Sequence, residues 1–182
     1  KKLRKLNDSI STYTRYIDAF PNEASAYFGL GQLLQLQGDV QGAINNLKKS
    51  IELDSSSYMT HFYLASVYYE NNMSKDAEAE YKKVLQLNPS YVHALNNLAT
   101  LLSTKGEFEQ AIDCLLKAES QINDSDIDVN TKISIYCNLG VSYTGQGRLD
   151  EALSAYQAVN KLSPDHMGAI TGEANVLERS GK

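Results

Sequence analysis

The 182-residue sequence lacks the features that several classes of protein require. It contains no tryptophan, three prolines and only two cysteines, Cys114 and Cys137. Two cysteines do not make a disulfide framework or a zinc site by themselves, and free thiols favour a reducing compartment. No apolar run approaches the roughly 18 residues of a membrane-spanning helix, and no apolar segment follows the basic start as in a signal peptide. We therefore expect a cytoplasmic protein with no membrane partner.

The sequence also lacks the motifs that carry catalysis, cofactors or metals. Its histidines, His61, His93 and His166, are far apart, and no His-Glu-x-x-His pattern occurs. Neither cysteine has a nearby histidine, no phosphate loop with Gly-Lys-Ser/Thr is present, and the pair Gly29 and Gly31 lacks the third glycine of a dinucleotide loop. We predict no catalytic residue, no cofactor and no metal site in this segment, and we interpret it as not an enzyme.

Charge is moderate in amount and uneven in distribution. The chain has 17 basic and 22 acidic residues, a formal net charge of −5. Four basic residues lie within the first five positions, so residues 6–182 carry 13 basic against 22 acidic groups. A body with this acidic excess repels phosphate backbones, and we expect no nucleic-acid partner. The basic start is interpreted as a solvated helix end.

The sequence contains an internal repeat of 34 residues. The third and fourth copies are 41 residues apart, seven more than the other spacings. Apolar residues inside each copy recur at helical spacing, and no segment alternates with a period of two, so an all-α fold is predicted. The copies of the central pattern are Leu30-Gly31-x-x-Leu34, Leu64-Ala65-x-x-Tyr68, Leu98-Ala99-x-x-Leu102, Leu139-Gly140-x-x-Tyr143 and Glu173-Ala174-x-x-Leu177.

Each copy is predicted to be a pair of antiparallel helices. A short polar break such as Gln37-Gly38-Asp39 separates two apolar stripes, and its glycine suits a left-handed helix end. Small residues recur at one place in each helix, which lets the helix axes approach closely. In the second helix these residues are Ala43, Ala77, Ala111 and Ala152.

This spacing resembles the tetratricopeptide repeat family over essentially the whole chain. Tyr27 and Tyr136 occupy the family's aromatic position in two copies, whereas His61, Leu95 and Ile170 replace it in the others. The resemblance implies an α-solenoid of tandem antiparallel helix pairs that forms a right-handed superhelix. It also implies that first helices line the concave inner surface and that partner proteins dock there.

The repeat phase divides the chain into six segments. Both end segments are interpreted as single helices of truncated repeats, so we expect a fragment of a longer array. An alternative is that the array self-associates through these truncated ends. The segments are 1–23, a second helix, 24–57, 58–91, 92–132 and 133–166, which are complete units, and 167–182, a first helix.

The seven additional residues lie at the end of unit 92–132. Asp124, Asp126 and Asp128 alternate as in the start of a calcium loop, but Val129 and Ile135 stand where such a loop needs glycine and glutamate. We interpret the segment as a longer loop whose Asp and Asn residues cap the next helix. Longer helices that absorb about two turns are the alternative.

The lining of the concave surface is predicted from the second, fifth, ninth and twelfth residues of each unit. Among these twenty positions only Glu178 is charged, which argues against the family's carboxylate-clamp members, because a carboxylate needs Lys or Arg donors. A ladder of asparagines, as in the O-linked N-acetylglucosamine transferase region, is matched in part, since Gly29 and Tyr63 interrupt it. The matching asparagines are Asn96, Asn97, Asn138 and Asn175.

We therefore predict a non-catalytic protein–protein interaction scaffold that binds a partner peptide or helix in this groove. One alternative is the substrate-recruiting arm of a larger enzyme, such as an O-linked glycosyltransferase. Another reading of the aromatic residues is that they pack against neighbouring helices. The predicted groove residues are Phe28, Gln32, Gln35, Phe62, Ser66 and Tyr69 at an aromatic end, and Asn96, Asn97, Thr100, Asn138 and Asn175 at a polar end.

Overall fold

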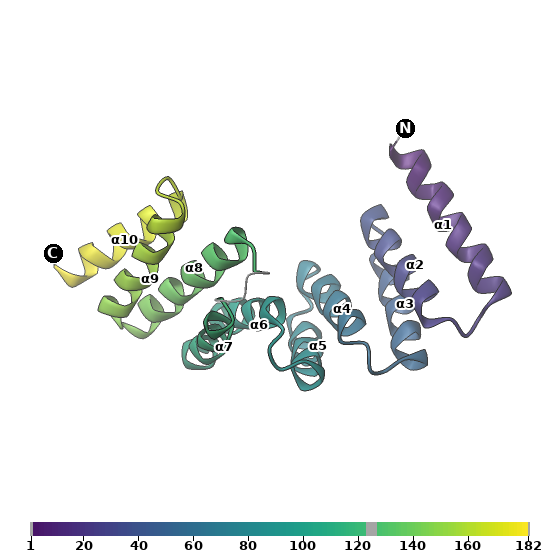
Figure 1. Ribbon diagram of the computed structural model, residues 1–182, viewed down its shortest axis with the longest axis horizontal. Coiled ribbons are helices and arrows are strands. Elements are labelled where there is room, and N and C mark those ends of the chain that lie inside the picture. The colour runs from purple at the N-terminus through teal and green to yellow at the C-terminus, as the bar shows by residue number, and fades with distance from the viewer. Residues whose placement is uncertain (1, 123–126, 182) are drawn as a thin grey trace. The chain divides into compact units, whose positions relative to one another are not determined.

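The protein is all-helical, as predicted (Figure 1). A computed structural model describes residues 2–122 and 127–181, with ten helices and no strand among them. The helices are α1 (Lys2–Ala19), α2 (Ala24–Gln37), α3 (Val40–Leu53), α4 (Tyr58–Glu70), α5 (Ser74–Leu87), α6 (Val92–Thr104), α7 (Phe108–Ser120), α8 (Val129–Gln146), α9 (Leu149–Leu162) and α10 (Met167–Ser180). None of the helices in these described ranges is long and apolar enough to cross a bilayer.

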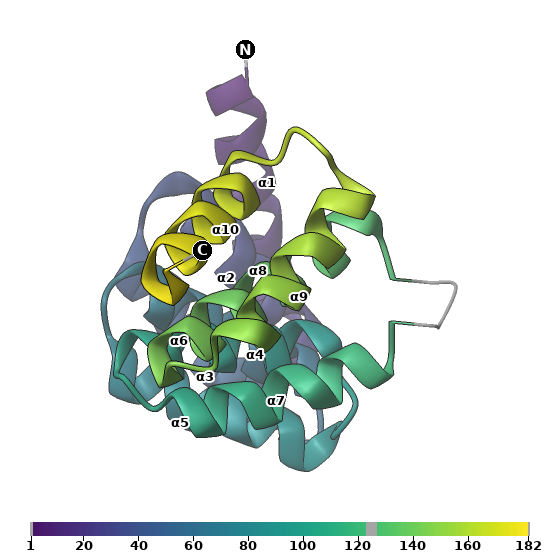
Figure 2. The same ribbon diagram turned by 90° about the vertical axis from the view of Figure 1, so that its left-hand side faces the viewer.

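The chain forms two compact units, Lys1–Pro89 and Ser90–Lys182. In the first unit α2 pairs with α3 and α4 with α5, while α1 packs on α2 and α3 on α4. In the second unit α6 pairs with α7 and α8 with α9, while α7 packs on α8 and α9 on α10. Figures 1 and 2 both show α8, α9 and α10 side by side. Consecutive antiparallel pairing is thus confirmed, and the division into repeat units at the predicted boundaries stays a prediction.

The turn between paired helices uses a left-handed residue, as the polar breaks predict. Gly38, Gly106 and Gly147 have φ angles of 90°, 80° and 76°. Asn72 takes the same place between α4 and α5 with φ 60°. Asparagine is among the few side chains that tolerate this region, so the turn is kept where glycine is absent.

Small residues lie at the contacts between paired helices. Ala43, Ala77, Ala111 and Ala152 of the second helices are all 0% exposed. Ala174 of α10 differs, because it is exposed and no described helix follows α10 to cover it. The recurring small residue is therefore buried wherever a partner helix is present.

The additional residues are divided between a connection and a longer helix. α8 has 18 residues, whereas the other four first helices have 13 or 14, and it begins at Val129, four residues before the predicted unit start. Asp128 caps it, since its carboxylate accepts hydrogen bonds from the backbone of Asn130 and Thr131 at 2.9 and 3.1 Å. Capping of the next helix by an aspartate is confirmed. The interpretation of the additional residues as a longer loop alone is corrected, because α8 takes up some of them. Asp124 and Asp126 lie outside the described residues.

One tyrosine ties three helices of the second unit together. Tyr156 of α9 is 4% exposed, and its ring lies over Gly140 of α8 and Gly172 of α10. A Cβ atom built on Gly140 would lie 2.5 Å from the ring, which no real side chain tolerates. In the first unit Tyr13 of α1 covers Gly29 of α2 in the same manner. Glycine at these places lets the ring lie directly against a helix backbone.

We expect Gly172→Ala to destabilise the second unit. The added methyl group overlaps the Tyr156 ring, and overpacking of this kind costs about 1–3 kcal/mol, against about 1 kcal/mol gained from helix propensity. Gly168→Ala is the matched control on α10, because its Cβ meets only His166, at 3.1 Å. Urea unfolding followed by circular dichroism measures both; a Gly172→Ala midpoint at or above the wild-type value would contradict the packing described.

Candidate functional site

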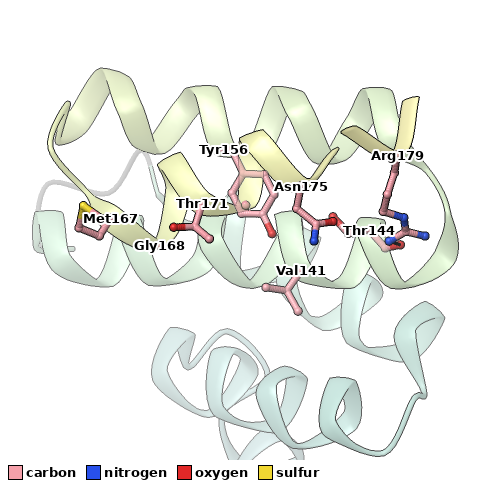
Figure 3. Close-up of a pocket in the computed structure, with 9 residues that line it drawn as sticks. Val141, Thr144, Tyr156, Met167, Gly168, Thr171, Asn175 and Arg179 are labelled. Atoms are coloured by element: carbon pink, nitrogen blue, oxygen red, sulfur yellow. Dashed lines mark hydrogen bonds between the residues drawn. The ribbon is translucent and has the colours of Figure 1, made fainter. Parts of the chain in front are cut away.

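A hollow of about 580 Å³ lies between α8 and α10 in the second unit (Figure 3). We call it the α8–α10 hollow. Five of its nine lining positions belong to the stripe predicted from the repeat phase. The lining residues are Val141, Thr144, Tyr156, Met167, Gly168, Thr171, Gly172, Asn175 and Arg179.

Tyr156 brings its hydroxyl group to this hollow. Burial raises the pKa of the Tyr156 hydroxyl, and a hydrogen bond with Thr144 opposes the rise. The Thr144 hydroxyl donates a hydrogen bond to the Gly140 carbonyl at 2.7 Å. The phenol is therefore neutral at physiological pH and serves as part of the lining rather than as an acid or base.

Arg179 is the charged residue of the lining, and the predicted stripe missed it. Its Nη1 atom donates to the backbone carbonyl of Thr144 at 3.0 Å (Figure 3). The repeat phase pointed instead to Glu178, which does not line the hollow. The predicted stripe takes four positions of each unit, but a long arginine side chain can reach the hollow from a neighbouring position. Arg179 is the thirteenth residue of the segment 167–182, so a stripe that included this position would have found it.

The asparagines of α6 and α8 bind each other. Nδ2 of Asn138 donates to Oδ1 of Asn96 at 2.9 Å and to Oγ1 of Thr100 at 3.0 Å. Nδ2 of Asn96 donates in turn to Oγ of Ser134 at 3.1 Å. The structure thus brings three of the predicted polar residues together, and it uses both Asn138 donors to join two helices. Asn97 is half-buried in the same helix, and Asn175 lies apart from them, in the α8–α10 hollow.

A second hollow, of about 680 Å³, lies in the first unit, and we call it the α2–α4 hollow. The predicted residues Gln32 and Gln35 line it, and Nε2 of Gln35 donates to Oε2 of Glu70 at 2.7 Å. Its apolar surface comes from α1, α2 and α4. The lining residues are Tyr13, Gly29, Gln32, Leu33, Gln35, Leu36, Tyr63 and Glu70.

The predicted aromatic residues of the first unit do not line that hollow. Phe28 stands edge-on to Tyr63 with ring centroids 5.1 Å apart, and Phe62 lies 6.0 Å from Tyr81. Both phenylalanines are half-buried, which agrees with the alternative that they pack against neighbouring helices. Ser66 donates to the Phe62 carbonyl at 3.0 Å, whereas Tyr69 is 38% exposed.

One pair of residues contradicts the expectation that neither cysteine has a histidine nearby. Sγ of Cys137 lies 3.8 Å from Nδ1 of His166, because the turn before α10 packs beside α8. Burial raises the pKa of the Cys137 thiol, and His166 Nδ1 accepts a hydrogen bond from the Ala169 backbone at 3.2 Å as the cap of α10. The thiol is not activated, so the pair is no nucleophile and base. Within residues 2–122 and 127–181, no three potential metal ligands come together.

Comparisons with known proteins agree with the helical repeats. Three family models described as tetratricopeptide repeat match residues 1–58, 61–91 and 90–163. Tetratricopeptide repeat protein 8 of Caenorhabditis elegans is 20% identical over 96% of this chain and 33% of its own length. The human protein O-mannosyl-transferase TMTC3 is 26% identical over 98% of this chain and 19% of its own length. This chain therefore spans a third or less of the length of both curated relatives.

Solved structures share the fold. YrrB, a tetratricopeptide repeat protein with an unusual peptide-binding site, superposes with a TM-score of 0.77. It is 24% identical, and the match covers 93% of this chain and 84% of YrrB. At this identity the likeness shows the arrangement of helices alone.

Asn138 joins two helices of the second unit, whereas Asn175 lines the α8–α10 hollow, and mutation distinguishes these two positions. We expect Asn138→Ala to destabilise the unit by about 1–3 kcal/mol, because Asn96 and Thr100 lose the donor that satisfies them. Asn175→Ala is the matched control and should leave stability unchanged, because its exposed side chain has no structural partner among the described residues. Urea unfolding measures both variants; equal midpoints would refute a structural role for Asn138.

Proposed function

Because the chain belongs to the tetratricopeptide repeat family, we propose that it is a non-catalytic scaffold that binds an extended segment of a partner protein along its first helices. One observation carries this proposal. In each unit a hollow opens beside first helices, at α2 and α4 in one unit and at α8 and α10 in the other. Each hollow includes a tyrosine that lies against a glycine of the next first helix.

The chemistry of the hollows suits a peptide ligand. An extended peptide presents alternate side chains to pockets and its backbone groups to hydrogen-bonding partners. Tyr13 and Tyr156 supply apolar ring surface, while Gln32 and Asn175 carry amides that both donate and accept. Neither lining includes a cysteine, histidine or lysine, which supports binding rather than catalysis.

A second candidate function is the recruiting arm of a larger glycosyltransferase. The match to a protein O-mannosyl-transferase, of which this chain spans 19%, favours it. In this case the segment still binds peptide, and the transferase activity resides elsewhere in a longer protein. Sugar transfer by the natural full-length protein to peptides that this segment binds would distinguish the arm from a free-standing scaffold.

Peptides that bind the wild-type chain can be selected from a random 12-residue display library. We expect Thr171→Trp to weaken the binding of these peptides. The indole fills the α8–α10 hollow, and the exposed position tolerates the larger side chain. A Kd weaker by at least about ten-fold, which corresponds to about 1.4 kcal/mol, is expected by fluorescence polarisation.

Gln157→Trp on the exposed surface of α9 is the matched control, and it should bind as wild type does. Gln32→Trp and Lys83→Trp form the corresponding pair in the first unit. Selected peptides that bind all four variants as tightly as wild type would disprove docking along the first helices. Failure to select any peptide would refute the proposed function itself.

A further inference from the structure

The α8–α10 hollow has a cationic end without an internal counter-charge. Arg179 is the charged residue among the nine that line it, and it forms no ion pair with any residue in the described ranges. The two glutamates of α10 supply no carboxylate to the lining. Glu173 accepts a hydrogen bond from Asn160 at 2.7 Å, and Glu178 does not line the hollow. A ligand in this hollow therefore meets one positive charge and no carboxylate from its lining.

The guanidinium of Arg179 is anchored in a way that leaves most of its donors available. One Nη1 bond, at 3.0 Å, goes to the Thr144 carbonyl in the last turn of α8. Carbonyl groups at a helix C-terminus carry partial negative charge, which favours this contact. A guanidinium has five N–H donors in a planar fork, so four remain, and their geometry matches a carboxylate.

The opposite end of the hollow is apolar. Met167, at this end, is 72% exposed, whereas Val141, which is 50% exposed, lies one helical turn before Thr144 and lines the middle of the hollow. Gly168 and Gly172 have no side chains, so the α10 backbone at these two residues and the Tyr156 ring together form the floor of the hollow. Figure 3 shows Met167 and Arg179 at opposite ends, with Thr171, Tyr156 and Asn175 between them. This end suits an aliphatic side chain.

The distance between the two ends sets the spacing of the ligand groups. Arg179 follows Gly168 and Gly172 by eleven and seven residues. At about 1.5 Å per helical residue these separations are roughly 11–17 Å. An extended peptide rises about 3.3 Å per residue, so about four residues cover this distance. Side chains four residues apart in an extended strand lie on the same face.

We propose that the α8–α10 hollow binds an extended peptide segment that carries an aliphatic side chain and, about four residues away, an aspartate or glutamate. Arg179 receives the carboxylate, and the floor formed by Tyr156 and the two glycines receives the aliphatic group. Asn175, which lies between them, offers its amide to the peptide backbone. This inference rests on the proposed function, since it assigns the chemistry of the segment bound at one of the two hollows.

The test uses nine-residue fluorescein-labelled peptides with leucine at position 3, serine at the other positions, and glutamate, glutamine or lysine at position 7. Fluorescence polarisation with the whole 182-residue chain should give a Kd at least ten-fold tighter for the glutamate peptide than for the glutamine peptide. Arg179→Gln should remove this difference. Arg148→Gln is the matched control, because this exposed arginine pairs with Glu151 outside the hollow, and it should preserve the difference.

Reversing the charge at position 179 distinguishes a direct contact with the peptide carboxylate from a structural effect of losing Arg179. In Arg179→Glu the lysine peptide should bind more tightly than the glutamate peptide, and circular dichroism should show unchanged helicity. Equal binding of the three peptides to wild type, or an unchanged glutamate preference in Arg179→Gln, would overturn the inference. In that event library-selected peptides that lose affinity in Thr171→Trp would still support the proposed function, whereas the absence of any selected peptide would refute both.

Discussion

The contact of an aromatic ring with a bare helix backbone governs the arrangement of the second unit. Tyr156 reaches both α8 and α10 because Gly140 and Gly172 place no side chain in its way. Tyr156 and Gly172 also line the α8–α10 hollow. The residues that pack these helices together are therefore also residues of the hollow. The first unit repeats the device with Tyr13 and Gly29, which also line a hollow.

Much of the fold was predictable because the repeat encodes it locally. Helical periodicity, a left-handed residue between paired helices and a small residue at each helix contact follow from residues a few positions apart. Gly38 and Ala43 therefore behave as their pattern indicates. Asn72 was harder to interpret, because its role rests on a backbone angle that asparagine adopts less readily than glycine.

The candidate site was predictable only in part, because its details depend on contacts between neighbouring helix pairs. Repeat phase placed Thr171 and Asn175 in the α8–α10 hollow. It did not show that Asn138 donates hydrogen bonds to Asn96 and Thr100, or that Arg179 donates one to Thr144. These contacts join residues 35–42 positions apart, and they depend on side-chain rotamers that no periodicity specifies.

The hydrogen bond from Asn138 to Asn96 also limits how this array can be rearranged. Tandem repeats are often regarded as interchangeable modules, since each contacts mainly its neighbours. Here the amide of α8 requires a matching amide on the preceding first helix. A duplicated α4–α5 pair inserted before α8 would offer Phe62 at the register position of Asn96, so Asn138 would lose one of its two acceptors. Exchanging α6 and α8 together keeps this hydrogen bond, so we expect α6 to α9 to be transferable between arrays as one unit more readily than either helix pair alone.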